Sequence, residues 1–336
     1  MHTPPNNDSQ ELMRRIYAPD MPPCIERIAS APALQRLQDV GMHCGCEYTS
    51  FPMFQGLKKY SRYEHSIGCA LIVWHFTHDV RQTIAALLHD IATPTFAHVI
   101  DFLNGDHLKQ ESTERGTEDL IQNSTEIMQF VQQEGLTVSD ISNYHLYPIA
   151  DNDSPRLSAD RLEYTLSNIV NYHIAPSDAV KHWYDSLIVG ENEDGEAELM
   201  FADLATAEEF CLAALQTSYI YIADEDRFAM QTLAELLKKH ISRGILTQAD
   251  LYQTESHVIT LLIQDSEARQ DWLHYRALHH IQRNSPHPDA QIIRSKKRHI
   301  NPYVATQGRT ATLSPRFAQA LNTFLDTPLD TPLWGE

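Results

Sequence analysis

The segment RQTIAALLHDIATP, residues 81–94, is a nearly continuous apolar run that ends in two ionisable side chains, His89 and Asp90. The run is too long for a buried strand, so the pattern predicts a buried helix over residues 81–91, which Pro94 closes. An imidazole and a carboxylate are costly to bury without a partner. The end of this helix therefore needs a bound cation or an opposite charge beside it.

A second apolar run, EHSIGCALIVWHFTHDV at residues 64–80, precedes the first and also predicts a buried helix, with His65 at its start. A third helical pattern covers residues 158–170 and carries Asp160 near its beginning. Metal ligands can lie far apart in sequence when the helices that carry them pack side by side. Imidazole and carboxylate ligands together suit iron, manganese, nickel, zinc, cobalt or magnesium. We therefore expect one divalent metal ion as the cofactor.

The remaining patterns predict an all-α protein, with helical periodicity over residues 32–40, 113–133, 206–222, 226–240, 248–262 and 265–280. One β-hairpin is expected from residues 187–189 and 197–201, which flank an acidic, glycine-containing turn. The predicted organisation is a flexible N-terminus (1–15), a helical core (16–180), a small β-hairpin insertion (181–205), a helical C-terminal half (206–284) and a less regular C-terminal extension (285–336).

Composition excludes some classes of protein. The net charge of −19 disfavours duplex nucleic acid as a partner, because binding to nucleic acid draws on Lys and Arg. The negative charge is compatible with a small phosphorylated substrate, because a bound metal ion can make the local charge of a pocket positive. Five cysteines, an odd number, suit a reducing cytosol rather than a disulfide framework. No signal peptide and no membrane-spanning run of about 18 apolar residues is found, so a cytoplasmic location without membrane contact is expected.

Three segments, in order, resemble the motifs of the HD-domain metal-dependent phosphohydrolase superfamily. They are RYEHSIG (residues 62–68), ALLHDI (86–91) and SADRLEY (158–164), beside the family's RFEHSLG, ALLHDIG and DADRLDY. The flanking segments LQRL (34–37) and RHINP (298–302) also resemble family segments, so the resemblance covers about residues 20–305. The branch that the chain resembles most contains deoxynucleoside triphosphate triphosphohydrolases and their bacterial relatives.

The resemblance implies a mainly helical HD-domain fold and the hydrolysis of a phosphate ester or anhydride in a nucleotide or a similar small phosphorylated substrate. The metal ligands that it implies are His65, His89, Asp90 and Asp160. The substrate contacts that it implies are Arg62, Arg161, Tyr164, Gln35, Thr93 and Thr113. The catalytic groups that it implies are His98, Glu114 and Asp160. Because relatives often form oligomers, it also implies a homo-oligomer.

The sequence departs from the family in the half of the site that moves protons. The family's HDIGHGPFSH reads HDIATPTFAH here, so Thr93 replaces one histidine, and Thr113 stands where the family has another. His98 and Glu114 are left as candidate proton carriers. These departures keep two alternatives open: a phosphodiesterase or exonuclease for short single-stranded or cyclic nucleotides, and a regulatory module that binds metal and nucleotide with weak or lost catalysis. The basic run RSKKR, residues 294–298, is interpreted as a solvated face, with binding of a phosphorylated ligand or effector, or of an acidic partner surface, as the alternatives.

Overall fold

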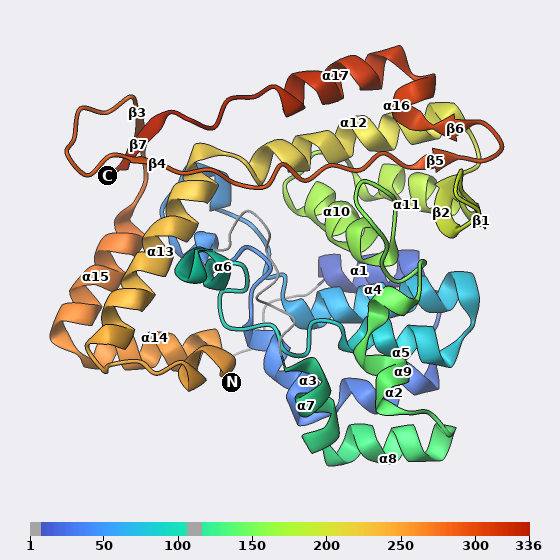
Figure 1. Ribbon diagram of the computed structural model, residues 1–336, viewed down its shortest axis with the longest axis horizontal. Coiled ribbons are helices and arrows are strands. Elements are labelled where there is room, and N and C mark those ends of the chain that lie inside the picture. Colours follow the sequence, from blue (N-terminus) through green and yellow to red (C-terminus); the bar gives the residue numbers. More distant parts are fainter. Residues whose placement is uncertain (1–7, 106–115) are drawn as a thin grey trace.

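The computed structural model describes residues 8–105 and 116–336 and is mainly helical (Figure 1). It confirms the predicted fold class, a mainly helical protein with a small β insertion. Thr113 and Glu114 lie outside the described residues. The α-helices are α1 (Asp8–Tyr17), α2 (Pro23–Ala29), α3 (Pro32–Gln35), α4 (Arg62–Thr77), α5 (Val80–Leu88), α6 (Val99–Asn104), α7 (Thr117–Asn123), α8 (Thr125–Glu134), α9 (Val138–Ser142), α10 (Ala159–Asn171), α11 (Ser177–Asp185), α12 (Leu204–Ile220), α13 (Asp224–Ser242), α14 (Glu255–Gln264), α15 (Ser266–Ala277), α16 (Thr310–Leu313) and α17 (Pro315–Leu325). Short 3-10 helices are η1 (Arg36–Asp39), η2 (Cys46–Tyr48), η3 (Pro52–Phe54), η4 (Tyr144–Leu146) and η5 (Ala249–Tyr252).

Helices α4 and α5 are the two apolar runs of the sequence. Helix α4 begins with a capping box, in which Ser61 and Glu64 satisfy each other's backbone N–H groups. Helix α5 begins with Asp79, whose carboxylate accepts from the backbone N–H of Arg81 and Gln82. Helix α5 ends at Leu88, earlier than predicted, because the chain turns there and Thr93 N–H donates to the carbonyl of Asp90. The two metal-ligand candidates after α5 therefore lie in a turn.

Helix α10 packs across α4 at a point where α4 has a glycine. A Cβ atom on Gly68 would lie 2.5 Å from Cγ of Glu163, so only glycine allows this approach. Ser158 caps α10, and its hydroxyl accepts from the backbone N–H of Arg161. The start of α10, which carries Asp160, is thereby held beside the start of α4.

Besides the predicted helix over 32–40, which continues from α3 into η1, two predicted helices are interrupted in the structure. The pattern over 113–133 forms α7 and α8, separated at Ser124, whose extended backbone and hydroxyl cap α8 through Ile127 N–H. The pattern over 248–262 forms η5 and then α14. In both places a Ser or Thr side chain competes for backbone N–H groups and starts a new helix.

The predicted hairpin is present as β1 (Leu187–Glu191) and β2 (Ala197–Phe201). It is part of a four-stranded sheet of order β1-β2-β5-β6, with β5 (Tyr303–Val304) and β6 (Gly308–Arg309). A second sheet has the order β3-β7-β4, from β3 (Ile281–Arg283), β7 (Pro332–Gly335) and β4 (Gln291–Ile292). The C-terminal part is more regular than predicted, because it also contains α16 and α17. Between β4 and β5 an extended segment, residues 293–302, crosses the molecule (Figure 1).

The apolar side chains form two cores. The first is built mainly by α1 to α5, α8, α10 to α12 and α17. The second is built by α6, α13, α14, α15 and residues 44–54. One cavity is lined by Tyr144 from the first core and by Cys44 and Met230 from the second, so it lies where the two cores meet.

Candidate metal centre

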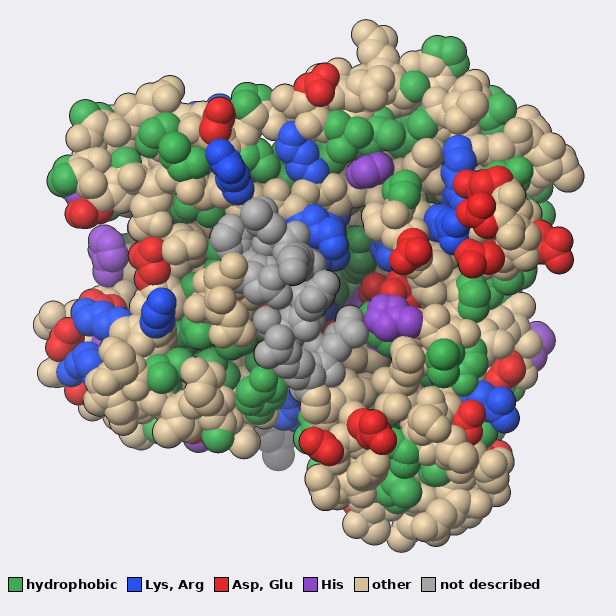
Figure 2. Space-filling view, in the orientation of Figure 1, with side chains coloured by type: hydrophobic (Ala, Val, Ile, Leu, Met, Phe, Trp, Pro, Cys, Tyr) green, Lys and Arg blue, Asp and Glu red, His purple; other side chains and the backbone are tan. Residues whose placement is uncertain are grey.

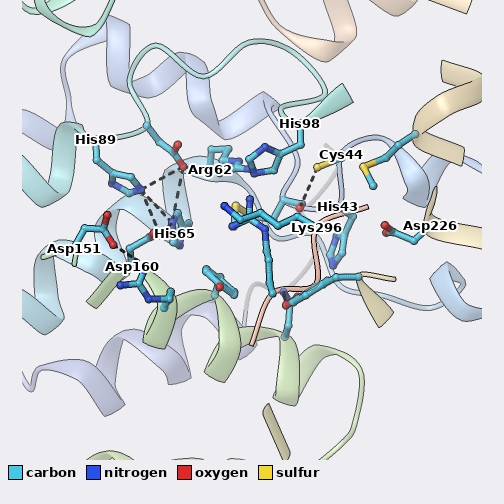
Figure 3. A pocket seen from close by; sticks show the side chains of 18 of the residues that line it. His43, Cys44, Arg62, His65, His89, His98, Asp151, Asp160, Asp226 and Lys296 are labelled. Carbon is cyan, nitrogen blue, oxygen red and sulfur yellow. Dashed lines mark hydrogen bonds and ion pairs between the residues drawn. The ribbon is translucent and has the colours of Figure 1, made fainter. Parts of the chain in front are cut away.

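The four predicted metal ligands lie together at one end of this cavity (Figure 3). His65 lies in the first turn of α4, His89 and Asp90 in the turn after α5, and Asp160 in the first turn of α10. The Nε2 atoms of His65 and His89 are 3.2 Å apart. Oδ1 of Asp160 lies 3.0 Å from Nε2 of His65 and 3.8 Å from Nε2 of His89. Oδ2 of Asp90 lies 3.5 Å from Nε2 of His89.

The Nδ1 atom of each imidazole has a polar partner, which directs Nε2 toward the centre of the site. Nδ1 of His89 donates to the carbonyl of Ala86 over 2.7 Å, which leaves Nε2 with its lone pair facing the centre. Nδ1 of His65 lies 2.5 Å from Oε2 of Glu163, a carboxylate that orients the ring in the same way. Two lone pairs and two carboxylates then converge. Such a donor set suits a divalent cation. Burial lowers the pKa of His65, but contacts with Cys69, Asp160 and Glu163 outweigh burial and raise that pKa well above its usual value.

Glu163 is the residue of the centre that sequence reasoning missed. Its side chain is 1% exposed and accepts from Ser167 Oγ over 2.7 Å, from Tyr17 over 3.3 Å and from the Tyr60 hydroxyl. These donors fix the carboxylate against His65. The sequence does contain a signal for Glu163, because a residue three positions after Asp160 lies on the same face of a helix.

Asp90 is held by two neighbours. Arg62 Nη1 donates to Asp90 Oδ2 over 2.9 Å, and Thr93 Oγ1 donates to Oδ1 over 2.6 Å. Burial opposes ionisation, but Arg62 and the two histidines outweigh it and hold the pKa of Asp90 well below its usual range. Asp90 is therefore a carboxylate oriented toward the centre.

Cys69 also lies near the centre, and its Sγ is 3.6 Å from both ring nitrogens of His65. A group of four candidate ligand atoms, from His65, Cys69, His89 and Asp160, falls within 4.8 Å. Burial raises the pKa of the Cys69 thiol to about 12. Because the thiolate rather than the thiol binds metal, Cys69 is a weaker candidate than Asp90.

Two predicted substrate contacts line the cavity but are largely engaged elsewhere. The Arg62 guanidinium is paired with Asp90, and its Nε atom is buried without a hydrogen-bond partner among the described residues. Arg161 donates from Nε to the carbonyl of Arg156 over 2.7 Å, from Nη1 to Asp151 over 3.0 Å, and from Nη2 to Asn152. Arg161 thus holds the loop before α10.

Two other predicted contacts, Gln35 and Thr93, are not among the described residues that line the cavity. Nε2 of Gln35 donates to the carbonyl of Ala29 over 2.6 Å. Thr93 is 1% exposed and its hydroxyl is bound to Asp90. The geometry therefore does not support a direct substrate contact from Gln35 or Thr93. Thr93 instead positions a candidate metal ligand.

His98 and Tyr164 do line the cavity. Nδ1 of His98 lies 3.0 Å from Oδ2 of Asp101, which is fully buried, and this contact leaves Nε2 available. Burial lowers the pKa of His98, against the opposing effect of Asp101. His98 is thus neutral near pH 7 and can accept or donate a proton.

The cavity has a volume of about 290 Å³. Figure 2 shows a hollow near the middle of this face, where basic, acidic and histidine side chains gather. Sequence reasoning did not assign several of the residues that line it, namely His43, Cys44, Tyr144, Asn168, Tyr172, Tyr221, Asp226, Lys296 and Arg298. They come from segments far apart in sequence. The two basic residues among them were interpreted as part of a solvated run.

Comparisons with known proteins agree with the geometry. No family model matches the chain. The chain is 28% identical over 243 residues to the uncharacterized protein YdhJ of Bacillus subtilis, an alignment that covers 70% of each chain. It is 30% identical over 185 residues to the metal-dependent phosphohydrolase cns2 of Cordyceps militaris, which covers 52% of this chain and 50% of that protein. A crystal structure of a hypothetical protein from Aquifex aeolicus matches 88% of this chain and 89% of that one, with a TM-score of 0.62 and 19% identity, and so shares the fold.

The likeness to a metal-dependent phosphohydrolase and the His–Asp cluster together support the HD-type superfamily, a hydrolase activity and a metal cofactor. The chain spans about half the length of the Cordyceps protein. No described helix is both long and apolar enough to span a bilayer.

Proposed function

We propose that the protein hydrolyses a phosphate ester or anhydride of a small phosphorylated substrate, a nucleotide or a compound of similar size. One observation carries the proposal: the Nε2 atoms of His65 and His89 converge with Asp90 and Asp160 at one end of the cavity. These four residues would hold one divalent ion. Such an ion polarises a phosphoryl oxygen and lowers the pKa of a bound water.

His98 is the group of this chain that carries a proton during the reaction. Hydrolysis breaks the P–O bond to the leaving group, which takes up a proton as the attacking water loses one. Asp101 fixes the orientation of His98, and burial keeps it neutral, so Nε2 can accept a proton and pass it on. His98 would therefore take over part of the work that two histidines do in the triphosphohydrolases that the chain resembles.

The end of the cavity away from the metal centre favours a substrate with a flat, polar ring. Tyr172 and Tyr221 line it, and Nδ2 of Asn168 donates to the Tyr221 hydroxyl over 2.9 Å. Asn168 and His43 bring further buried polar atoms to this end, and burial lowers the pKa of His43 against the opposing effect of its contact with Asn168. Aromatic surfaces beside buried polar atoms suit a nucleobase. This arrangement supports a nucleotide, with or without the triphosphate of the branch that the chain resembles.

The test is phosphate release from a panel of substrates by protein loaded with Mn²⁺, Fe²⁺, Co²⁺ or Mg²⁺. The panel contains nucleoside mono-, di- and triphosphates, cyclic nucleotides and short oligonucleotides. We expect turnover of a mononucleotide, abolished in His89→Ala and kept in His257→Ala, whose exposed histidine pairs with Asp250 away from the cavity. Release of nucleoside monophosphates from oligonucleotides would favour the phosphodiesterase alternative. Nucleotide binding without turnover would favour the regulatory module.

Two further predictions concern the protein as a whole. A cytoplasmic location is proposed, and fractionation of cells that express the protein would test it. A homo-oligomer is proposed by analogy with relatives, and sedimentation velocity of the purified protein would measure it.

A further inference from the structure

We propose that Lys296 and Arg298, on the extended segment 293–302, bind the phosphate group of the substrate opposite the metal centre. The inference rests on the proposed function and names the residues that take the substrate's anion. It replaces two expectations at once: that the basic run is a solvated face, and that Arg62 and Arg161 are the main phosphate contacts.

The segment brings two cationic side chains to the same wall of the cavity. Lys296 and Arg298 both line it, whereas Lys297, between them, donates from Nζ to the carbonyl of Leu325 in α17. This alternation is the one expected of extended chain, in which residues two apart lie on one face. In Figure 3, Lys296 lies between the cluster of His65, His89 and Asp160 and the Asp226 end of the cavity.

The segment is anchored on both sides of these two residues. Ile293 is buried, and its carbonyl accepts from Nη1 of Arg227, which is itself fully buried. Farther along, Asn301 N–H donates to the carbonyl of Pro155 over 2.8 Å. The backbone that carries Lys296 and Arg298 is therefore held in position before a ligand arrives, which lowers the entropy cost of binding.

The charges of the other lining residues are also compatible with an anion in the cavity. The described lining residues carry four carboxylates, those of Asp90, Asp151, Asp160 and Asp226. Arg62 neutralises Asp90, and Arg161 neutralises Asp151. Burial raises the pKa of Asp226 to about 8, so this group is mostly uncharged at neutral pH. Asp160 belongs to the metal centre. Lys296 and Arg298 add two positive charges to the lining of the cavity, in a protein of net charge −19, and guanidinium and ammonium groups form strong hydrogen bonds with phosphate oxygens.

Arg298 also lies near the residues that would contact the reacting end of the substrate. Its guanidinium is hydrogen-bonded to the Tyr164 side chain, and its charge acts on His98. The ring of Tyr164 lies 6.4 Å from that of His65. A phosphate held by Arg298 is consequently within the part of the cavity that the metal centre and His98 share.

The experiment measures binding of inorganic phosphate to metal-loaded protein by isothermal titration calorimetry. Lys296→Gln and Arg298→Gln should each raise Kd about tenfold or more, the loss expected for one charge-assisted hydrogen bond. Lys297→Gln is the matched control: it removes the same charge from the same segment, and we expect its Kd to stay within about twofold of wild type. Arg298→Lys should recover part of the affinity, since it keeps the charge but not the two-pronged geometry.

Metal content and thermal melting of each variant show whether the metal centre and the fold are intact. Equal phosphate affinity for Lys296→Gln and Lys297→Gln, or no phosphate binding by the wild type, would overturn the inference. Turnover of a phosphorylated substrate by all variants alike would do the same while leaving the proposed function standing. Conversely, phosphate binding that depends on Lys296 and Arg298 in a protein without turnover would support the inference and count against the proposed hydrolysis.

Discussion

The two ends of the cavity differ in how the chain builds them. The metal end comes from α4, α5 and α10, and each of its residues sits in a short local pattern such as Leu87-Leu88-His89-Asp90. The opposite wall comes from residues 42–44, α13 and the extended segment 293–302, whose residues share no local pattern (Figure 3). Local sequence pattern therefore predicts the metal end, while the opposite wall depends on the tertiary fold, and we propose that it sets the choice of substrate.

The largest expected effect is at the metal end. His89→Ala removes an imidazole whose Nε2 faces the centre, so bound metal should fall to background and kcat/KM by about 10³-fold or more, because the ion supplies several kcal/mol of transition-state stabilisation. Elemental analysis and phosphate release measure the two effects. Full metal occupancy in His89→Ala would show that this histidine is no ligand.

The next effect separates proton transfer from metal binding. His98→Asn should lower kcat about 10²-fold or more while metal content stays unchanged. The neutral form of His98 is the active one, and burial places its pKa below 6.5, so wild-type activity should fall only as the pH drops below that value. A pH profile of kcat/KM tests this, since the acidic limb assigned to His98 should be absent from His98→Asn.

A smaller effect on metal affinity is expected from Glu163, which contacts the candidate ligand His65. Glu163→Gln removes the charge that orients His65, and it should weaken metal affinity by about 10- to 100-fold. Competition with a chelator measures the affinity, and the control is Glu209→Gln, an exposed glutamate of α12. If both variants hold metal as tightly as the wild type, Glu163 has no role in the centre.

The smallest effect should appear at the wall away from the metal and depend on the substrate. Asn168→Ala removes a buried amide that lines the cavity, and KM for a nucleotide should rise about tenfold. The rate with p-nitrophenyl phosphate, which has no nucleobase, should change little. A similar loss with both substrates would show that Asn168 supports the fold rather than substrate choice.

The sequence allowed prediction of those features that local pattern determines. Helices α4, α5, α10 and the β1–β2 hairpin follow from apolar periodicity and turn residues, and the positions of the four ligand candidates follow from the same segments. Glu163 could also have been predicted from the sequence, because helical spacing places it beside Asp160. Its role depends on Gly68 in another helix, however, and no single segment shows that contact.

The rest depends on contacts between distant parts of the chain. Thr93 stands at a family histidine position, but only the structure shows that its hydroxyl binds Asp90. Likewise, Lys296 and Lys297 are equivalent in sequence, and only the path of the segment separates the one that lines the cavity from the one that caps α17. Composition and charge could not distinguish a solvated run from a binding wall.

The most direct test of the metal centre is anomalous diffraction from crystals of protein purified without chelator, recorded across the absorption edges of manganese, iron, cobalt, nickel and zinc. We predict one ion at about 2.0–2.2 Å from Nε2 of His65, Nε2 of His89 and one carboxylate oxygen each of Asp90 and Asp160. An ion held elsewhere, or an ion that takes the Cys69 sulfur in place of Asp90, would contradict the ligand set proposed for this protein.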